Sequence, residues 1–127
     1  MVRGRALPAV VLVGIAVLAA CTATPGREPP PQVPGSDPQR GAQLIEQLGC
    51  GSCHVVPGVR GADGLVGPPL IHWSRRGFIA GELPNNATNL IRWLMDPQSV
   101  EPGTDMPNLH LSQTQARDIA AYLFGIQ

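Results

Sequence analysis

The 127-residue sequence contains no lysine, so all nine of its basic residues are arginine. Nine acidic residues balance them, and the resulting net charge of zero argues against a nucleic-acid partner. Aromatic residues are also scarce, with two Trp, two Phe and one Tyr, which excludes a large aromatic core. A domain with so little core material usually needs a disulfide, a metal or a cofactor to stabilise it.

Cysteine is rare too: there are three, and two of them belong to the stretch Cys50-Gly51-Ser52-Cys53-His54. This spacing is typical of covalent haem c attachment, in which each thiol forms a thioether and the histidine binds the iron. A thioredoxin-like site would need a βαβ context, and a zinc site would need a second pair of ligands. A plain disulfide is the remaining alternative for an exported chain.

The sequence has no apolar run long enough for a comfortable membrane span. The apolar run 7–20 follows two arginines and predicts a signal peptide over residues 1–20. It ends in Leu18-Ala19-Ala20-Cys21, which resembles a bacterial lipobox. We therefore predict a lipid on Cys21 that anchors the chain to the extracytoplasmic face of the cell membrane. The alternative is an ordinary cleavage site followed by an incidental thiol.

Residues 21–36 form a proline-rich linker after the predicted lipid site. Such a segment cannot pack a core and favours extended polyproline II, which spans about 3.1 Å per residue, or about 45 Å in all. A proline-rich recognition ligand is the alternative, but the adjacent lipid favours a stalk. We predict that the folded domain covers residues 37–127.

Two helices are predicted at the ends of this domain. The first has Asp37 as its N-cap, with a proline at the first helical position, and it stops at Gly49. The last begins after Ser112, which forms a capping box with Gln115. Because Gly41 has no side chain, the last helix is expected to cross the first closely there.

A further helix is predicted from Thr88 as N-cap to about Asp96, where a proline closes it. Leu90, Trp93 and Leu94 lie on one side of this helix. Core packing alone explains Trp93, and it is compatible with packing against a haem.

The stretch Gly67-Pro68-Pro69-Leu70 offers support for the attached group. An axial histidine needs its second ring nitrogen held, and the stiff backbone carbonyl of Pro68 is suited to this. Leu70 would pack on the haem face. Without a haem, these residues would be merely a turn.

Haem propionates need hydrogen-bond donors, and the forked guanidinium of arginine is their natural partner. Arg76 is the first candidate and Arg75 the second. Two solvated arginines are the alternative interpretation of this pair.

The loop Pro102-Gly103-Thr104-Asp105-Met106-Pro107 contains the candidate sixth iron ligand. A lone methionine usually belongs to a core. Met106 instead lies in a proline- and glycine-rich loop without helical periodicity, so we predict that its thioether binds the iron. His110 is the rival ligand.

Taken together, these residues resemble the class I c-type cytochromes and, within them, the cytochrome c domain fused to subunit II of some bacterial haem–copper oxidases. The resemblance covers roughly residues 38–127. The matching stretches are 50–54, 67–70, 74–76, 81–85, 89–93, 96–97, 102–107 and 121–123. It implies a small all-α fold of several short helices around one haem c, with His54 and Met106 as axial ligands. It also implies that Trp93 lies beside the haem and that Thr104 can bond a propionate.

We therefore expect a lipid-anchored carrier of single electrons in a bacterial respiratory chain rather than an enzyme. Its expected partners are the membrane and a redox protein such as a terminal oxidase or a quinol-oxidising complex. The missing lysines argue against strongly steered docking. One alternative is a haem sensor or peroxidase-type enzyme from which Met106 dissociates. Another is a fixed subunit of an oxidase or reductase complex.

Overall fold

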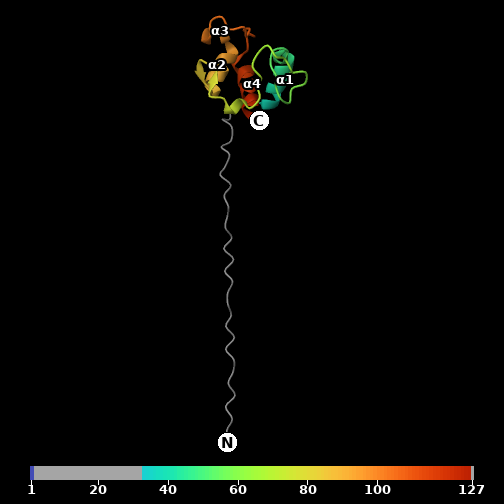
Figure 1. Cartoon of the computed structure of the whole chain (residues 1–127), viewed down its shortest axis with the longest axis vertical. Coiled ribbons are helices and arrows are strands. Elements are labelled where there is room, and N and C mark those ends of the chain that lie inside the picture. Colours follow the sequence, from blue (N-terminus) through green and yellow to red (C-terminus); the bar gives the residue numbers. More distant parts are fainter. Residues whose placement is uncertain (2–32, 127) are drawn as a thin grey trace.

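Figure 1 shows the computed structural model, which describes Met1 and residues 33–126. The predicted signal peptide (apart from Met1), the predicted lipid site Cys21 and the linker up to residue 32 lie outside the described residues. None of the helices in the described part has the length and apolar character that a membrane crossing requires.

The described chain is mainly helical, as the sequence predicts. Its elements are α1 (Pro38–Gln47), the 3₁₀ turns η1 (Cys50–Ser52) and η2 (Trp73–Arg75), the strands β1 (Phe78–Ile79) and β2 (Leu83–Pro84), and the helices α2 (Ala87–Met95), α3 (Pro97–Val100) and α4 (Gln113–Gly125). The two strands pair antiparallel, with Phe78 opposite Pro84 and Ile79 opposite Leu83. This small hairpin and an isolated antiparallel bridge between Val55 and Asp63 depart from the expected all-α class.

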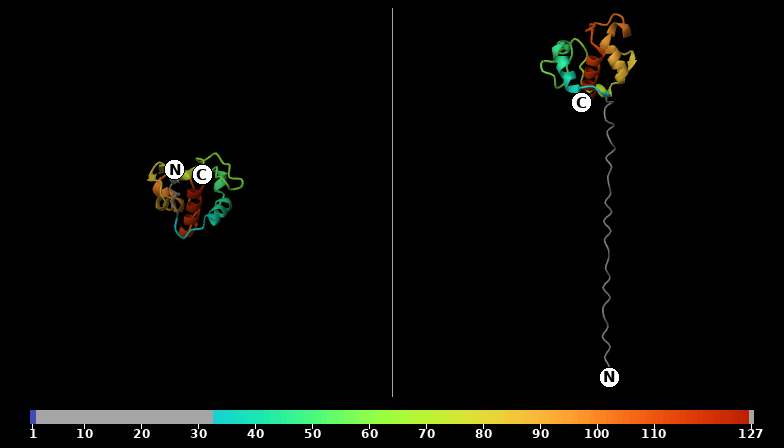
Figure 2. Two further views of the ribbon diagram at one scale, coloured as in Figure 1. Left: turned by 90° about the horizontal axis from the view of Figure 1, so that it is seen from below. Right: turned by 180° about the vertical axis from the view of Figure 1, so that it is seen from behind.

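Helix α4 lies in the middle of the domain, between α1 on one side and α2 on the other (Figures 1 and 2). Its apolar face supplies much of the core, namely Ala116, Ile119, Ala120, Leu123 and Phe124, none of which is more than 2% exposed. The close crossing predicted at Gly41 is confirmed, because a Cβ there would overlap the backbone carbonyl of Asp118.

The ends of α1 and α4 agree with the sequence prediction. The Asp37 carboxylate accepts hydrogen bonds from two backbone N–H groups in the first turn of α1. Gly49 follows α1 with a φ of 73°, a left-handed conformation that glycine adopts without strain. Ser112 and Gln115 form the predicted capping box at the start of α4.

The predicted N-cap of α2 is wrong by two residues. Asn86, not Thr88, caps this helix, and its side chain accepts a hydrogen bond from the Asn89 N–H at 2.9 Å. Helix α3 then begins at Pro97, directly after the Asp96 that ends α2. The apolar side of α2 is buried as predicted: Leu90, Trp93 and Leu94.

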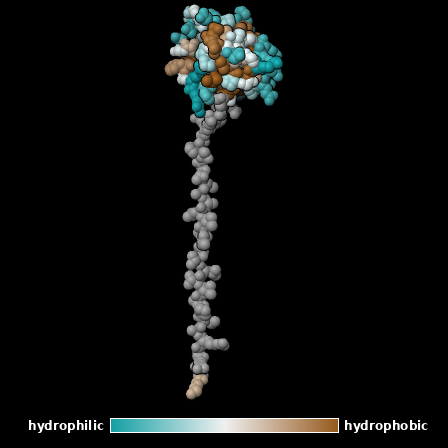
Figure 3. All heavy atoms as spheres, turned by 45° about the vertical axis from the view of Figure 1, so that its right-hand side comes forward, coloured by the Kyte–Doolittle hydropathy of each residue, from teal (hydrophilic) through white to brown (hydrophobic). Residues whose placement is uncertain are grey.

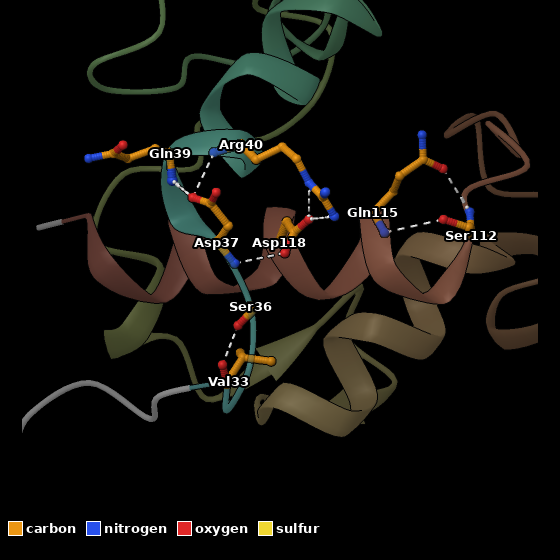
Figure 4. Close-up of polar contacts among 8 residues, drawn as sticks. All are labelled: Val33, Ser36, Asp37, Gln39, Arg40, Ser112, Gln115 and Asp118. Atoms are coloured by element: carbon orange, nitrogen blue, oxygen red, sulfur yellow. Dashed lines mark hydrogen bonds and ion pairs between the residues drawn. The ribbon is translucent and has the colours of Figure 1, made fainter.

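Residues 33–37, here called the N-terminal strap, are fastened to α4 (Figure 4). The Val33 side chain is buried, and Arg117 donates a hydrogen bond to the carbonyl of Pro34. The backbone N–H of Asp37 donates to Asp118 Oδ1 at 2.8 Å. The domain boundary predicted at residue 37 therefore falls inside a segment that packs on the domain.

Candidate functional site

The candidate haem-attachment stretch, residues 50–54, begins with the turn η1 directly after the left-handed Gly49. The backbone N–H groups of Cys53 and His54 both donate to the carbonyl of Cys50, at 3.2 and 3.0 Å. The two thiols are partly buried and are not joined to each other. Burial raises the pKa of the Cys50 thiol, the nearby Cys53 raises it further, and a backbone hydrogen bond opposes both effects. The turn thus presents two thiols and an imidazole within five consecutive residues.

The imidazole of His54 is held by the predicted proline. Its Nδ1 atom lies 2.7 Å from the carbonyl oxygen of Pro68. Because a carbonyl can only accept, Nδ1 must carry the proton, which leaves the lone pair of Nε2 for a metal. Iron bound at Nε2 would fit the Cys-x-x-Cys-His spacing.

Gly67 has a role that the sequence analysis missed. A Cβ at this position would overlap the His54 imidazole, and the Gly67 N–H donates to the carbonyl of Cys53 at 2.8 Å. The backbone therefore closes directly on the ring that Pro68 orients. A glycine immediately before the candidate proline is the only sequence signal for this contact.

The loop after His54 is tied to the attachment turn and to α4. The Gly64 N–H donates to the carbonyl of Gly51 at 3.0 Å. The hydroxyl of Tyr122 in α4 donates to the carbonyl of Pro57 at 2.6 Å. Burial raises the pKa of this phenol. Residues from η1 and α4 thus hold the loop that leads to Gly67.

The structure distinguishes the two candidate arginines. Arg76 is partly buried, donates to the carbonyl of Pro69 and lies over the Trp73 ring, 5.2 Å from its centroid. Arg75 is exposed. Only Arg76 of the pair therefore lies against the turn that carries Pro68.

The candidate sixth ligand lies on a loop held by α3. Met106 is partly buried against the hydrophobic core, and its carbonyl accepts a hydrogen bond from Gln98 Nε2 at 2.7 Å. Its N–H donates to Thr104 Oγ1 at 3.3 Å. The rival His110 is exposed, and its backbone has a φ of 51°.

Trp93, which the resemblance places beside the haem, and Leu70, which follows the proline turn, belong to the same hydrophobic core. Trp93 is 8% exposed, and Leu70 packs partly buried against that core. The structure thus brings Leu70, Trp93 and Met106 to one apolar cluster, while Cys50 joins it from the attachment turn.

Apolar side chains also lie in solvent next to this region. Leu65 and Val66, directly before Gly67, are 87% and 80% exposed, and Phe78 in β1 is 62% exposed. Figure 3 shows apolar surface gathered on one face of the domain between hydrophilic margins. Exposed apolar surface of this kind is typical of interaction sites.

These features fit haem c on the chemistry of the donors alone. Two unjoined thiols lie beside a histidine whose Nδ1 is occupied by a carbonyl and whose Nε2 is left for iron. A zinc site would need further ligands, and the described part of the chain has no group of three or more His, Cys, Asp or Glu residues placed to hold a metal ion.

Three curated relatives share this region with the chain. It is 38% identical over 89 residues to cytochrome c oxidase subunit 2 of Alkalihalophilus pseudofirmus, covering 69% of this chain and 25% of that protein. The same-named protein of Bacillus sp. strain PS3 is 35% identical over 89 residues, covering 67% and 25%. That of Bacillus subtilis strain 168 is 31% identical over 93 residues, covering 70% and 26%. The chain thus matches about a quarter of the length of each relative.

The family model for cytochrome c matches residues 38–126, from the start of α1 to the residue after α4. The match contains the attachment turn, the proline turn and the methionine loop. This chain therefore belongs to the cytochrome c family, an electron-transfer family whose domain binds haem c covalently.

Proposed function

We propose that this protein is a lipid-anchored carrier of single electrons in a bacterial respiratory chain, with its iron between His54 and Met106. The observation that carries the proposal is the 2.7 Å contact between His54 Nδ1 and the carbonyl of Pro68. It supports an axial role for His54 because it leaves one ring nitrogen, in one orientation, for the iron.

Haem c supplies an iron that takes up and releases one electron. The chain's part is to hold two ligands and to surround the group with apolar side chains. Pro68 keeps the His54 ring in place. Leu70 and Trp93, in the core cluster, exclude water from the same region.

Met106 would complete the iron coordination. A thioether opposite a histidine favours the reduced iron, as is general in cytochromes c, and so raises the potential. The hydrogen bonds from Gln98 to the Met106 carbonyl and from the Met106 N–H to Thr104 support this role, because they restrict the loop on both sides of the side chain. With His54 and Met106 both bound to it, the iron would have no position left for a substrate and would supply electron transfer alone.

The partner and the location are proposed on separate grounds. Each of the relatives named above is a subunit of cytochrome c oxidase, which supports a terminal oxidase as a partner; a quinol-oxidising complex would be the electron donor. A lipid on Cys21 would hold the domain at the extracytoplasmic face of the membrane. Because residues 33–37 are fastened to α4, only residues 22–32 would form the stalk, or about 34 Å if extended at about 3.1 Å per residue.

Ligation is tested on the purified holoprotein by absorption spectroscopy and carbon monoxide. We expect six-coordinate low-spin spectra in both oxidation states, with the weak near-infrared band of methionine ligation in the ferric state. Rapid carbon monoxide binding by the reduced protein would favour the sensor or enzyme alternative instead.

Met106→Ala should open the iron to carbon monoxide and lower the midpoint potential. Met95→Ala is the matched control, because Met95 in α2 also packs partly buried against the core. It should leave both properties unchanged. An unaltered potential in Met106→Ala would point to another ligand.

The anchor is tested separately by membrane fractionation. Cys21→Ser should release the haem-containing protein from membranes, since it removes the residue that carries the lipid. Retention of the variant on membranes would refute the lipid anchor without affecting the ligand assignment.

A further inference from the structure

The buried indole of Trp73 has a polar atom that the described part of the chain does not satisfy. Trp73 is 5% exposed, and its Nε1 atom has no hydrogen-bond partner among residues 33–126. The one other buried side-chain atom of this kind in the described residues is Oδ1 of Asn85. Buried N–H groups in native proteins are nearly always paired, so an unpaired one indicates a partner outside the described residues.

The backbone around this indole is held rigidly. Asn85 Nδ2 donates to the carbonyl of Trp73 at 2.9 Å and to that of Arg76 at 3.1 Å. Both N–H groups of the Asn85 amide are therefore used to brace η2 and the residue after it. The unpaired Nε1 is consequently not the result of a loosely placed loop.

The charge next to the indole is positive. The Arg76 guanidinium lies over the Trp73 ring, 5.2 Å from its centroid, and donates to the carbonyl of Pro69. Its remaining N–H groups are able to bind a further acceptor. A buried N–H donor beside a guanidinium matches a carboxylate, which accepts several hydrogen bonds and carries the opposite charge.

The same contacts connect this site to the iron ligand. Pro69, which accepts the Arg76 hydrogen bond, directly follows the Pro68 that holds His54. A haem c attached at Cys50 and Cys53 would carry two carboxylates of its own, and the turn that holds His54 is also the turn that Arg76 contacts. We propose that Trp73 donates its indole N–H to a haem propionate and shares that propionate with Arg76. This inference rests on the proposed binding of haem c at His54.

The test uses reduced holoprotein labelled with ¹⁵N-tryptophan. The chain has two tryptophans, and Trp73→Phe assigns the indole signals. We expect the Trp73 N–H to exchange with heavy water at least tenfold more slowly than in an unfolded chain, and to change its chemical shift as the propionate titrates. A Trp73 signal that exchanges freely, or that is insensitive to pH, would overturn the proposal.

A second measurement is the midpoint potential of the Trp73→Phe holoprotein as a function of pH. Phenylalanine keeps an aromatic ring but has no N–H, so the propionate charge is less neutralised. We expect a lower potential, with the pH-dependent part of the curve moved to higher pH. Phe78→Leu, an exposed aromatic in β1, is the control and should leave the curve in place.

The two readouts separate a propionate contact from a purely structural role. If Trp73→Phe lowers only the unfolding midpoint and leaves the pH curve of the potential unchanged, the residue is a core residue and the proposal is wrong. A failure of haem attachment would instead appear as the loss of the haem spectrum in the unmodified protein.

Discussion

The ion pair between Arg40 and Asp118 has two unequal halves, and this predicts an asymmetric response to mutation. The Asp118 side chain is 2% exposed, whereas that of Arg40 is 50% exposed. Asp118 accepts a hydrogen bond from Arg40 Nε at 2.6 Å and one from the Asp37 backbone at 2.8 Å. Figure 4 shows that this carboxylate joins α4 to the strap and to the first turn of α1. We predict that Arg40→Met destabilises the protein more than Asp118→Asn does.

The magnitudes follow from what each change leaves behind. Arg40→Met leaves the buried Asp118 carboxylate with one hydrogen-bond donor, the Asp37 backbone N–H. Breaking a buried ion pair in this way costs about 3–5 kcal/mol. Because the guanidinium is half in solvent, we expect the lower end, about 3 kcal/mol. Asp118→Asn keeps an oxygen for the Asp37 N–H and lets Arg40 turn into water, so its cost is about 1–2 kcal/mol. For a domain of this size, about 3 kcal/mol lowers Tm by about 12–24 °C.

The assay is urea unfolding of the holoprotein, followed by far-ultraviolet circular dichroism. The midpoint should fall while the slope m stays constant. The double variant Arg40→Met/Asp118→Leu removes both charges and should recover much of the loss. Arg60→Met is the control, because it breaks an exposed ion pair with Glu46 and should leave the midpoint unchanged. Equal costs for Arg40→Met and Asp118→Asn would refute the reasoning.

Two further predictions concern the loop that orients His54. Gly67→Ala should destabilise the holoprotein by about 1–3 kcal/mol in urea unfolding, since its Cβ overlaps the imidazole, whereas Gly77→Ala, where an added Cβ meets nothing within 4 Å, should change little. An equal effect of both substitutions would contradict this packing. Tyr122→Phe should cost about 1 kcal/mol through the lost hydrogen bond to Pro57. Because burial raises the Tyr122 pKa above its unfolded value, the wild-type protein holds this proton more tightly when folded. Its stability should therefore fall as pH rises above about 10, and the variant should lack that part of the loss.

Local rules placed the helix ends well because each cap needs only its own neighbours. Asp37 and Ser112 precede apolar periodic segments and bond N–H groups two or three residues away. The same rule could not choose between Asn86 and Thr88, since both residue types cap helices. The structure uses Asn86, whose extended backbone, with φ −142° and ψ 168°, lets its side chain reach Asn89.

The features that the sequence did not predict depend on distant residues or on very short elements. Each strand of the hairpin has two residues, too few to show an alternating pattern. The strap is held by Asp118, which lies 81 positions from Asp37. The unpaired Nε1 of Trp73 becomes visible only once burial is known. Part of the candidate site could be predicted from the sequence, because the Cys-x-x-Cys-His spacing and the proline turn are local motifs.

Helix α4 supports both the histidine loop and the N-terminal strap, although these have different tasks. Tyr122 holds the loop at Pro57, and one to one and a half turns earlier Arg117 and Asp118 hold the strap. A 13-residue helix behaves as one rigid element, so the histidine loop cannot turn relative to the strap without breaking one set of contacts. If a lipid holds the chain before the strap, α4 then fixes the orientation of the iron site relative to the point where the stalk ends. Loosening the strap should consequently change how the domain meets its partner while leaving the iron ligands in place.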